Sequence, residues 1–251
     1  MDPLLRSVHA TEDFFWHTLS RARMQRDGLR AFACGPHSRY LNPVLSPEFS
    51  SVALEHLEAV RAFYREQGLP WCWMLPAAEL TPALRLVMGG LGLESRGQSP
   101  VMLYRFGGAF RPEFRQEVRE VHGAGLADWD LPLQEGFPGD ERETRAYQAV
   151  HAAAERRAPG ALRHFVAYAG AEPVAAATLS LSPAGARIDD VATRTAHLRR
   201  GFGRAVTLRA RLEARAAGYP WCCLGASEEG FPLYRSLGFE VLYLNETFTA
   251  D

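Results

Sequence analysis

The chain has 251 residues, 47% of them hydrophobic, and its formal net charge at pH 7 is -1. This length suits one large domain or two small ones, and the apolar content is sufficient for a buried core. A nearly neutral chain has no general attraction to nucleic acid or to an anionic membrane, so any basic function must be local.

The cysteines and the apolar runs indicate a cytoplasmic protein. Cys34, Cys72, Cys222 and Cys223 show no CxxC spacing, so we expect reduced core cysteines rather than a zinc site or disulfides. Acidic residues and histidines interrupt the first twenty residues, and prolines and charges interrupt the most apolar run, Trp71–Leu93. Neither a signal peptide nor a membrane span is expected.

In the first half of the chain, hydrophobic spacing predicts alternating helices and strands. Helices are expected over Thr11–Arg26, Val52–Gln67 and Thr81–Met88, and strands or extended pieces over Arg30–Cys34, Tyr40–Leu45, Trp71–Leu75 and Val101–Phe106. The glycines and proline of Gly107–Glu113 then predict a boundary between two halves. We place the two domains at residues 1–108 and 112–251.

The second half repeats this kind of alternation. Strands are expected over Val118–His122, His164–Ala169 and Val174–Leu181, with a helix over Glu141–Arg157. Ile188 opens a further strand that ends near Arg194. A glycine turn follows, and then a basic helix that Gly218 ends.

The turn Arg199-Arg-Gly-Phe-Gly-Arg204 carries the clearest chemistry. Gly201 and Gly203 lack the Cβ atoms that would keep an anion away from backbone N–H donors at a helix N-terminus, and the three arginines add positive charge. The chain has no lysine, which excludes a Walker loop, and Val206 stands where a dinucleotide fingerprint needs a third glycine. A pyrophosphate site is expected; the alternative is a tight turn with solvated arginines.

This turn resembles the acetyl-CoA signature of the GNAT superfamily of N-acetyltransferases, Gln/Arg-x-x-Gly-x-Gly/Ala. Gly201 and Gly203 fill its last two fixed positions, whereas Leu198 stands where Gln or Arg is usual. Val191–Thr193 resembles the end of the family's cofactor-binding strand, and Gly225–Phe239 resembles its last helix with a Leu-Tyr-x-x-Leu-Gly-Phe ending. The resemblance implies an α/β fold with a mixed, mostly antiparallel sheet flanked by helices.

The two halves of the chain also resemble each other. Gly68–Met74 followed by Leu91–Glu94 is similar to Gly218–Leu224 followed by Leu237–Glu240. We infer two similar domains, the first a degenerate copy. Its Leu45–Ser51 segment has no glycine and no arginine, so it should not bind a pyrophosphate.

The resemblance implies direct acetyl transfer from acetyl-CoA to an amine. Backbone groups of Val191 and Thr193 would hold the pantetheine arm, and Arg199, Arg200, Gly201, Phe202, Gly203, Arg204 and Ala205 would hold the pyrophosphate. Ser227 stands where relatives contact the cofactor, with a helix cap as its alternative role. Tyr234 is the candidate general acid for the departing thiolate, or else a core aromatic residue.

Asp189 and Asp190 are the candidate bases for the amine, and because strand neighbours point to opposite faces, at most one should face it. Glu228 and Glu229 could attract a cationic acceptor or belong to a solvated turn. Trp129 is expected to be a packing anchor rather than an amine contact. His151, His164 and His197 lack metal-ligand spacing, so surface or core positions are expected and no metal site is predicted.

These inferences predict a cytoplasmic N-acetyltransferase that uses acetyl-CoA as co-substrate and modifies a primary amine of a small molecule. Nucleic acid and membranes are not expected as partners. The alternative is a non-catalytic acyl-CoA-sensing module that binds a protein partner. Tandem relatives that transfer aminoacyl groups from tRNA offer a third possibility, which the near-zero net charge disfavours.

Overall fold

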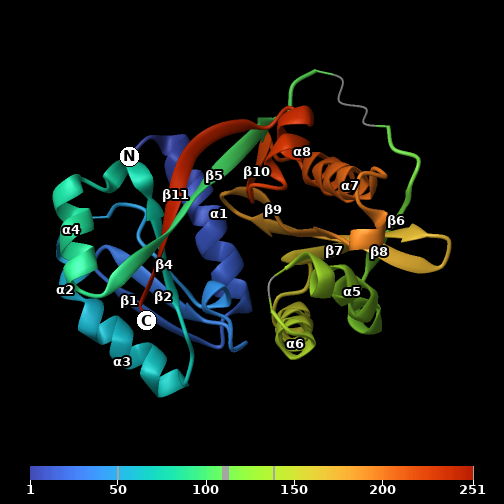
Figure 1. The fold of residues 1–251 in the computed structure, drawn as a ribbon. Coiled ribbons are helices and arrows are strands. Elements are labelled where there is room, and N and C mark those ends of the chain that lie inside the picture. The colour runs from blue at the N-terminus through green and yellow to red at the C-terminus, as the bar shows by residue number, and fades with distance from the viewer. Residues whose placement is uncertain (50, 109–112, 138, 251) are drawn as a thin grey trace.

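A computed structural model describes residues 1–49, 51–108, 113–137 and 139–250 (Figure 1). Its helices are α1 (Pro3–Leu19), α2 (Ser51–Glu55), α3 (Leu57–Gln67), α4 (Pro82–Gly90), α5 (Leu126–Gly136), α6 (Glu141–Arg157), α7 (Phe202–Ala216) and α8 (Phe231–Ser236). Its strands are β1 (Ala22–Arg26), β2 (Leu29–Ala33), β3 (Pro43–Leu45), β4 (Cys72–Pro76), β5 (Leu93–Arg105), β6 (Glu117–Val121), β7 (Leu162–Ala169), β8 (Glu172–Ser182), β9 (Gly185–Thr193), β10 (Trp221–Gly225) and β11 (Glu240–Ala250).

Over the described residues these strands form one mixed sheet, in the order β1-β2-β3-β4-β11-β5-β10-β9-β8-β7-β6. The neighbours β3–β4 and β9–β10 are parallel, and the other pairs are antiparallel. The predicted α/β class, with a mostly antiparallel sheet flanked by helices, is therefore confirmed.

The two halves of the chain exchange strands at the centre of this sheet. β5 pairs with β10 of the second half, and β11 from the end of the chain pairs with β4 of the first half. Figure 1 shows β5 and β11 side by side between the two groups of helices. The predicted boundary between residues 108 and 112 lies outside the described residues, and the division into domains 1–108 and 112–251 stays a prediction.

Helices cover both faces of the strands β7, β8 and β9 (Figure 1). Alternate strand residues enter different clusters: Val166 and Ala176 pack with α5 and α6, whereas Ala167 and Ala177 pack with α7. The N-terminal helix α1 also packs against β8, β9 and α6. One apolar core consequently joins Phe15 and Phe32 of the first half to side chains of the second half.

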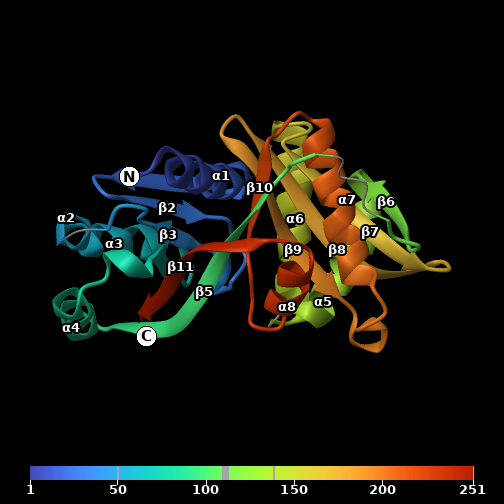
Figure 2. The same cartoon turned by 90° about the horizontal axis from the view of Figure 1, so that it is seen from above.

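Both halves contain the order helix, strand, helix, long strand: α3–β4–α4–β5 in the first and α7–β10–α8–β11 in the second. In each half a glycine with positive φ follows the first helix, Gly68 or Gly218, and another precedes the long strand, Gly92 or Gly238. Figure 2 shows α2, α3 and α4 gathered on one side of the molecule and α5 to α8 on the other. This correspondence supports the predicted duplication.

Some predicted elements were wrong in extent. The helix predicted over Thr11–Arg26 ends at Leu19, because Ser20 adopts an extended backbone, and Ala22–Arg26 forms β1 instead. The helix predicted over Val52–Gln67 is divided at His56, whose ψ is 3°. The extended piece predicted over Tyr40–Leu45 begins as a short 3-10 turn. Helix α5, which contains Pro132, was not predicted.

Candidate functional site

The strand β9 separates from its neighbour β10 partway along its length. The two parallel strands pair at Cys222 with Ala186 and at Cys223 with Arg187, and no further pair follows among the described residues. β9 continues to Thr193 and stays paired with β8 on its other side. Beyond Arg187, the edge of β9 that faces β10 therefore has no strand partner. The predicted backbone role of Val191 and Thr193 requires such an open edge.

Asp190 lies at a β-bulge in β9. The register with β8 shifts between Ala176 and Thr178, which pair with Ala192 and Asp189. Asp190 has a φ of 54°, which is uncommon for a residue with a side chain and often marks a functional site. The bulge interrupts the regular alternation of the strand just where the two candidate bases lie.

The arginine turn leads from β9 into α7. Arg199 and Gly201 both have positive φ values, 60° and 84°, and Gly201 is the N-cap of α7 without a side-chain cap hydrogen bond. The first N–H groups of a helix have no acceptor within the helix, and the helix dipole adds partial positive charge. This end of α7 is therefore a suitable site for an anion.

A pocket of about 480 Å³, which we call the turn pocket, opens over this helix end. Predicted cofactor residues line it: Thr193, Arg199, Gly201, Phe202, Gly203 and Arg204. Arg199 and Arg204 are exposed, and neither forms an ion pair with a carboxylate in the described part of the chain. Their positive charge is thus available to a ligand.

The structure gives a second physical reason for glycine at these two positions of the turn, besides the predicted access of an anion to the backbone. A Cβ atom on Gly201 would lie 2.8 Å from Nε2 of Gln116, and one on Gly203 would lie 2.9 Å from Oγ1 of Thr193. These glycines allow close packing within the protein as well as access to the pocket. Gln116 also donates a hydrogen bond of 2.9 Å to the Arg200 carbonyl oxygen. The sequence analysis missed Gln116 because no local pattern links it to the turn.

The remaining predicted cofactor residues are not among those that line the turn pocket: Val191, Arg200, Ala205 and Ser227. Ala205 is fully buried, and Val191 is partly buried in the core. The guanidinium of Arg200 lies 3.1 Å from Nδ1 of His197. Ser227 accepts a hydrogen bond of 3.1 Å from the N–H of Gly230, the N-cap residue of α8, and so stabilises the turn before that helix. Its cofactor contact stays a prediction.

Asp190 lines a second pocket, of about 170 Å³, which we call the Asp190 pocket. Tyr40 and Leu41 of the first half line one side, and residues of α5 and α6, among them Leu133 and Tyr147, line the other. The lining is largely apolar, with the carboxylates of Asp190 and Glu143 as its charged groups within the described residues. The N-terminal half therefore helps to shape this pocket.

Both pockets meet β9. Asp190 lines one, and Thr193 lines the other. Three residues along an extended strand span about 10 Å. α7 lies on one face of the sheet, and α5 and α6 lie on the other (Figure 1). Residues of α7 line the turn pocket, and residues of α5 and α6 line the Asp190 pocket. Two ligands could therefore approach the open edge of β9 from opposite faces.

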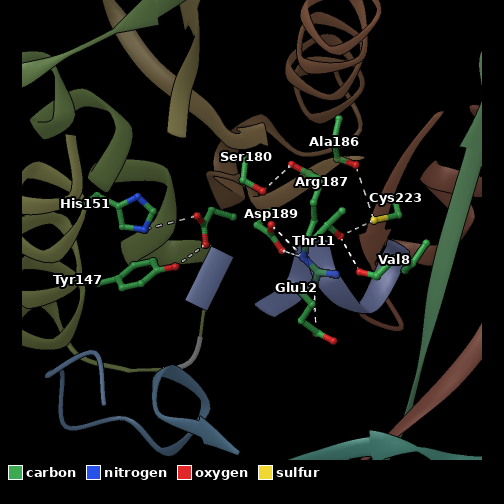
Figure 3. A network of polar contacts seen from close by, with 11 residues as sticks. Val8, Thr11, Glu12, Tyr147, His151, Ser180, Ala186, Arg187, Asp189 and Cys223 are labelled. Atoms are coloured by element: carbon green, nitrogen blue, oxygen red, sulfur yellow. Dashed lines mark hydrogen bonds and ion pairs between the residues drawn. The ribbon is translucent and has the colours of Figure 1, made fainter. Parts of the chain in front are cut away.

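The Asp190 carboxylate is largely buried. The Tyr147 hydroxyl donates a hydrogen bond of 3.1 Å to its Oδ1, and Nε2 of His151 lies 3.8 Å from its Oδ2 (Figure 3). Burial, reinforced by the nearby Asp189 charge, raises the pKa of Asp190 to about 7. A carboxylate with this pKa can exchange a proton with an ammonium group near neutral pH.

Asp189 has a different set of partners. Nε of Arg187 lies 2.9 Å from its Oδ1, and the same guanidinium lies 3.5 Å from Glu12 on α1 (Figure 3). Burial raises the pKa of Asp189, while Arg187 opposes this effect. Its charge is therefore committed to a buried ion-pair cluster. Of the two candidate bases, Asp190 is the one that lines a pocket.

Tyr234 lies on α8 and is 6% exposed, packed in the core with Phe239 at a ring distance of 6.0 Å. Burial and the Asp189 charge raise the pKa of its hydroxyl. Its phenol thus stays protonated, and it is not among the residues that line the two pockets. Glu228 and Glu229 are exposed, and Glu229 lines the turn pocket.

Trp129 and two histidines form a buried group beside Asp190. Trp129 is fully buried and its ring lies 4.5 Å from that of His151, as expected for a packing anchor. His151 and His164 are also fully buried and share a hydrogen bond of 2.8 Å, whereas His197 lies 3.3 Å from the carboxylate of Glu172. The proximity of His151 to Asp190 was not predicted, because it depends on the docking of α6 against β9.

The cysteines, the possible metal ligands and the helices were each compared with the predictions from the sequence. All four cysteines are buried and unpaired. Among the residues that the structure describes, no His, Cys, Asp and Glu side chains group in a way that could hold a metal ion. Within the same residues, no helix has the length and apolar character to span a membrane.

By sequence, neither a protein-family model nor a curated protein matches the chain. Solved structures do match it. A GCN5-related N-acetyltransferase from Kribbella flavida superposes with a TM-score of 0.74 at 17% identity, covering 97% of this chain and 95% of that one. A functionally unknown conserved protein from Staphylococcus epidermidis gives 0.68 at 12% identity, with coverages of 92% and 94%.

A GCN5-related N-acetyltransferase from Sphaerobacter thermophilus gives a TM-score of 0.61 at 18% identity and covers 88% of this chain and 76% of its own. At these identities the comparison establishes the fold. This chain has the fold of the GCN5-related N-acetyltransferases over nearly its whole length, and the resemblance drawn from the sequence is confirmed at that level.

Proposed function

We propose that this protein is an N-acetyltransferase that moves an acetyl group from acetyl-CoA directly to a primary amine of a small molecule. The observation that carries the proposal is the pair of pockets that meet β9, one lined by the start of α7 with Arg199 and Arg204 and one lined by Asp190. We also propose that it works in the cytoplasm, since buried unpaired cysteines suit a reducing compartment.

The turn pocket is proposed to bind the cofactor's pyrophosphate. The N–H groups at the start of α7 would donate hydrogen bonds to its oxygens, and Arg199 and Arg204 would pair with its negative charge. The acyl end would then follow the open edge of β9, where the backbone of Val191 and Thr193 can donate to and accept from it. Thr193 lines the pocket at the start of this route.

The Asp190 pocket is proposed to bind the amine. Its apolar walls suit a hydrophobic body, and Asp190 at its end suits an ammonium group. Asp190 would remove one proton from the ammonium, which leaves a neutral nitrogen with a lone pair. That nitrogen attacks the thioester carbonyl and becomes positively charged. As the C–S bond breaks, the nitrogen loses its second proton and the sulfur, hydrogen-bonded by Tyr234, gains one, which gives an amide and a free thiol.

An amine panel tests this proposal. Phenylethylamine and hexylamine represent apolar primary amines, and lysine and spermidine represent polar ones. We expect release of free thiol and an N-acetylated product with the apolar amines, and a Tyr234→Phe protein with lower kcat and little change in KM.

Two outcomes would contradict the proposal. If the wild-type protein bound acetyl-CoA but acetylated no amine, a non-catalytic sensor with a protein partner would be the better account. If the protein did not bind acetyl-CoA, both accounts would fail.

A further inference from the structure

We propose that Asp190, His151, His164 and Glu155 form a buried proton path that carries the acceptor's proton from the Asp190 pocket to solvent. This inference rests on the proposed acetyl transfer, because it assigns a route to the proton that the amine must lose. None of the four side chains binds the cofactor in the proposed site.

The four groups lie in a row. Oδ2 of Asp190 is 3.8 Å from Nε2 of His151, Nδ1 of His151 is 2.8 Å from Nε2 of His164, and Nδ1 of His164 is 3.3 Å from Oε1 of Glu155. Each imidazole uses one nitrogen toward the pocket and the other toward the surface. An imidazole arranged in this way can accept a proton on one side and release one on the other.

The two histidines of the path are shielded from solvent, and the Glu155 end lies near the surface. Both histidine side chains are fully buried, and the ring of Trp129 lies 4.5 Å from one and 5.1 Å from the other. Glu155 is partly exposed, and His122, which is mostly exposed, lies 3.6 Å from it. Glu155 also accepts a hydrogen bond of 3.1 Å from the Gly123 N–H. Glu155 is therefore the end of the row nearest to solvent, although its Oε1, which faces His164, is itself buried.

The number of protons in the row limits how many of its contacts can be hydrogen bonds at one time. Four groups make three contacts, and each contact needs one proton. Burial keeps the pKa of His151 well below its ordinary value and lowers that of His164, so the two neutral rings supply two protons. The third contact is closed only when a carboxyl group is protonated.

The longest contact is the one at Asp190, where Oδ2 of Asp190 and Nε2 of His151 both lack a hydrogen-bond partner. Nδ1 of His164 and Oε1 of Glu155 also lack one, but they lie closer together, at 3.3 Å. The resting state that fits has Nδ1–H on both rings. His151 then donates to His164, His164 donates to Glu155, and Nε2 of His151 faces an ionised Asp190 with its lone pair. A proton arriving on Asp190 would close this contact.

In the transfer, each of the four groups gains one proton and releases one. The amine's proton bonds to Asp190 and then to Nε2 of His151. His151 releases its Nδ1 proton to Nε2 of His164, His164 releases its own Nδ1 proton to Glu155, and Glu155 passes a proton to water. When the pocket is open, one proton enters at Glu155 and leaves through Asp190 into pocket water, which restores both tautomers. One proton reaches solvent per turnover.

Other charged and polar groups also face Asp190. Tyr147 donates to it from α6, Asp189 and Arg187 act on it from β9, and Thr178 lies against it on β8. Asp189 raises the pKa of Asp190, while the other three lower it. The row therefore begins at a group that can release its proton near neutral pH.

The first test needs no acceptor and no acetyl-CoA. Nitrogen NMR of the full chain with labelled histidine reports which nitrogen of each ring carries the proton. We expect Nδ1–H on both His151 and His164, and a pH-dependent shift of Nε2 of His151 with a midpoint at about 7, the pKa of Asp190. Asp190→Asn should abolish that midpoint, and Asp128→Asn, a matched carboxylate on α5, should preserve it.

A resting Nε2–H tautomer on either ring, or a midpoint that survives Asp190→Asn, would overturn the proton path. Failure of acetyl-CoA to bind would instead overturn the proposed function, so the two failures are distinguishable.

With an acceptor amine in hand, Glu155→Gln should lower kcat about tenfold, within the range of proton-transfer effects. It should also raise the solvent isotope effect on kcat and leave the KM for acetyl-CoA unchanged. Glu141→Gln removes a carboxylate from the same helix outside the row and should behave as wild type. Unchanged kcat and isotope effect in Glu155→Gln and in His164→Gln would contradict the path.

Discussion

Asp190 combines a strained backbone with a buried carboxylate at one position. A side chain held at a φ of 54° costs about 1–3 kcal/mol relative to a relaxed backbone. Its carboxylate is 10% exposed and loses hydration when ionised. Both features destabilise the fold and both place the group in its pocket, which is the combination expected of a functional residue.

Asp190→Asn tests the role of this carboxylate through pH. With a pKa of about 7, the base is competent only when ionised, so kcat/KM of the wild type should rise through neutral pH and level off above it. The Asn protein should lose at least about a hundredfold in kcat/KM. It should also lose this ionisation from its profile. A stopped assay of N-acetyl product across the pH range measures both effects, and an unchanged profile would remove Asp190 from the mechanism.

The same substitution should stabilise the fold at alkaline pH. The folded pKa of Asp190 lies above that of an unfolded Asp, so the stability associated with its protonated form is lost as pH rises toward and through about 7. Asn cannot ionise, and above neutral pH the variant should melt a few degrees higher than wild type. Thermal melts at acidic and alkaline pH check this sign, and a variant that melted lower at alkaline pH would contradict it.

At the scale of single residues, the sequence alone narrowed the candidate base to two neighbouring aspartates. It identified Asp189 and Asp190 but left the choice open. Arg187 and Asp189 are two residues apart on one strand and so share a face, which is a readable sign of an ion pair. The bulge that turns Asp190 toward α6 depends on the pairing of β8 with β9, and no local pattern encodes it.

The junction of β9 with α7 is the element on which the proposed cofactor site depends. The turn itself was predictable, because glycines and arginines before a helix have local consequences. The contact between Gly203 and Thr193 and the contribution of Gln116 were not, since both join residues that only the fold brings together. In the corresponding loop of the first half, Phe49 is buried against Trp73, and the expectation that this loop does not bind a pyrophosphate stays a prediction.

Gly203→Ala tests how tightly α7 docks on β9. The added Cβ would lie 2.9 Å from the short, branched side chain of Thr193, an overpacking that typically costs about 1–3 kcal/mol, against a gain of up to about 1 kcal/mol in helix propensity. We expect the melting temperature to fall by about 2–4 °C. A Gly203→Ala/Thr193→Ala double variant should recover much of that loss relative to Thr193→Ala alone, and an additive double-mutant cycle would show that the contact is not limiting.

At the scale of the whole molecule, the exchange of β5 and β11 makes the two halves of the chain interdependent. α1 packs on the second half, β11 completes the sheet of the first, and one core joins them. The repeated sequence predicted two similar copies but not this exchange, because repeats report local folding units and not which strand pairs with which.

The intact chain should consequently unfold in one cooperative step. Calorimetry should give a single transition whose calorimetric and van't Hoff enthalpies agree. A fragment of residues 113–251 would lack β5 and α1 and should not reach a folded state alone. Two separated transitions, or a stable fragment with native circular dichroism, would show that the halves are independent.

The central claim is that the turn before α7 binds acetyl-CoA, and isothermal titration of acetyl-CoA tests it most directly. The variant is Arg204→Glu, which reverses an exposed charge in the turn pocket, and the matched control is Arg65→Glu, the same change at an exposed arginine of α3. Wild type and Arg65→Glu should bind alike, and Arg204→Glu should bind at least about tenfold more weakly, since hydrogen bonds to charged groups contribute about 1.5–3 kcal/mol. Equal binding by all three proteins, or no binding by the wild type, would contradict the account.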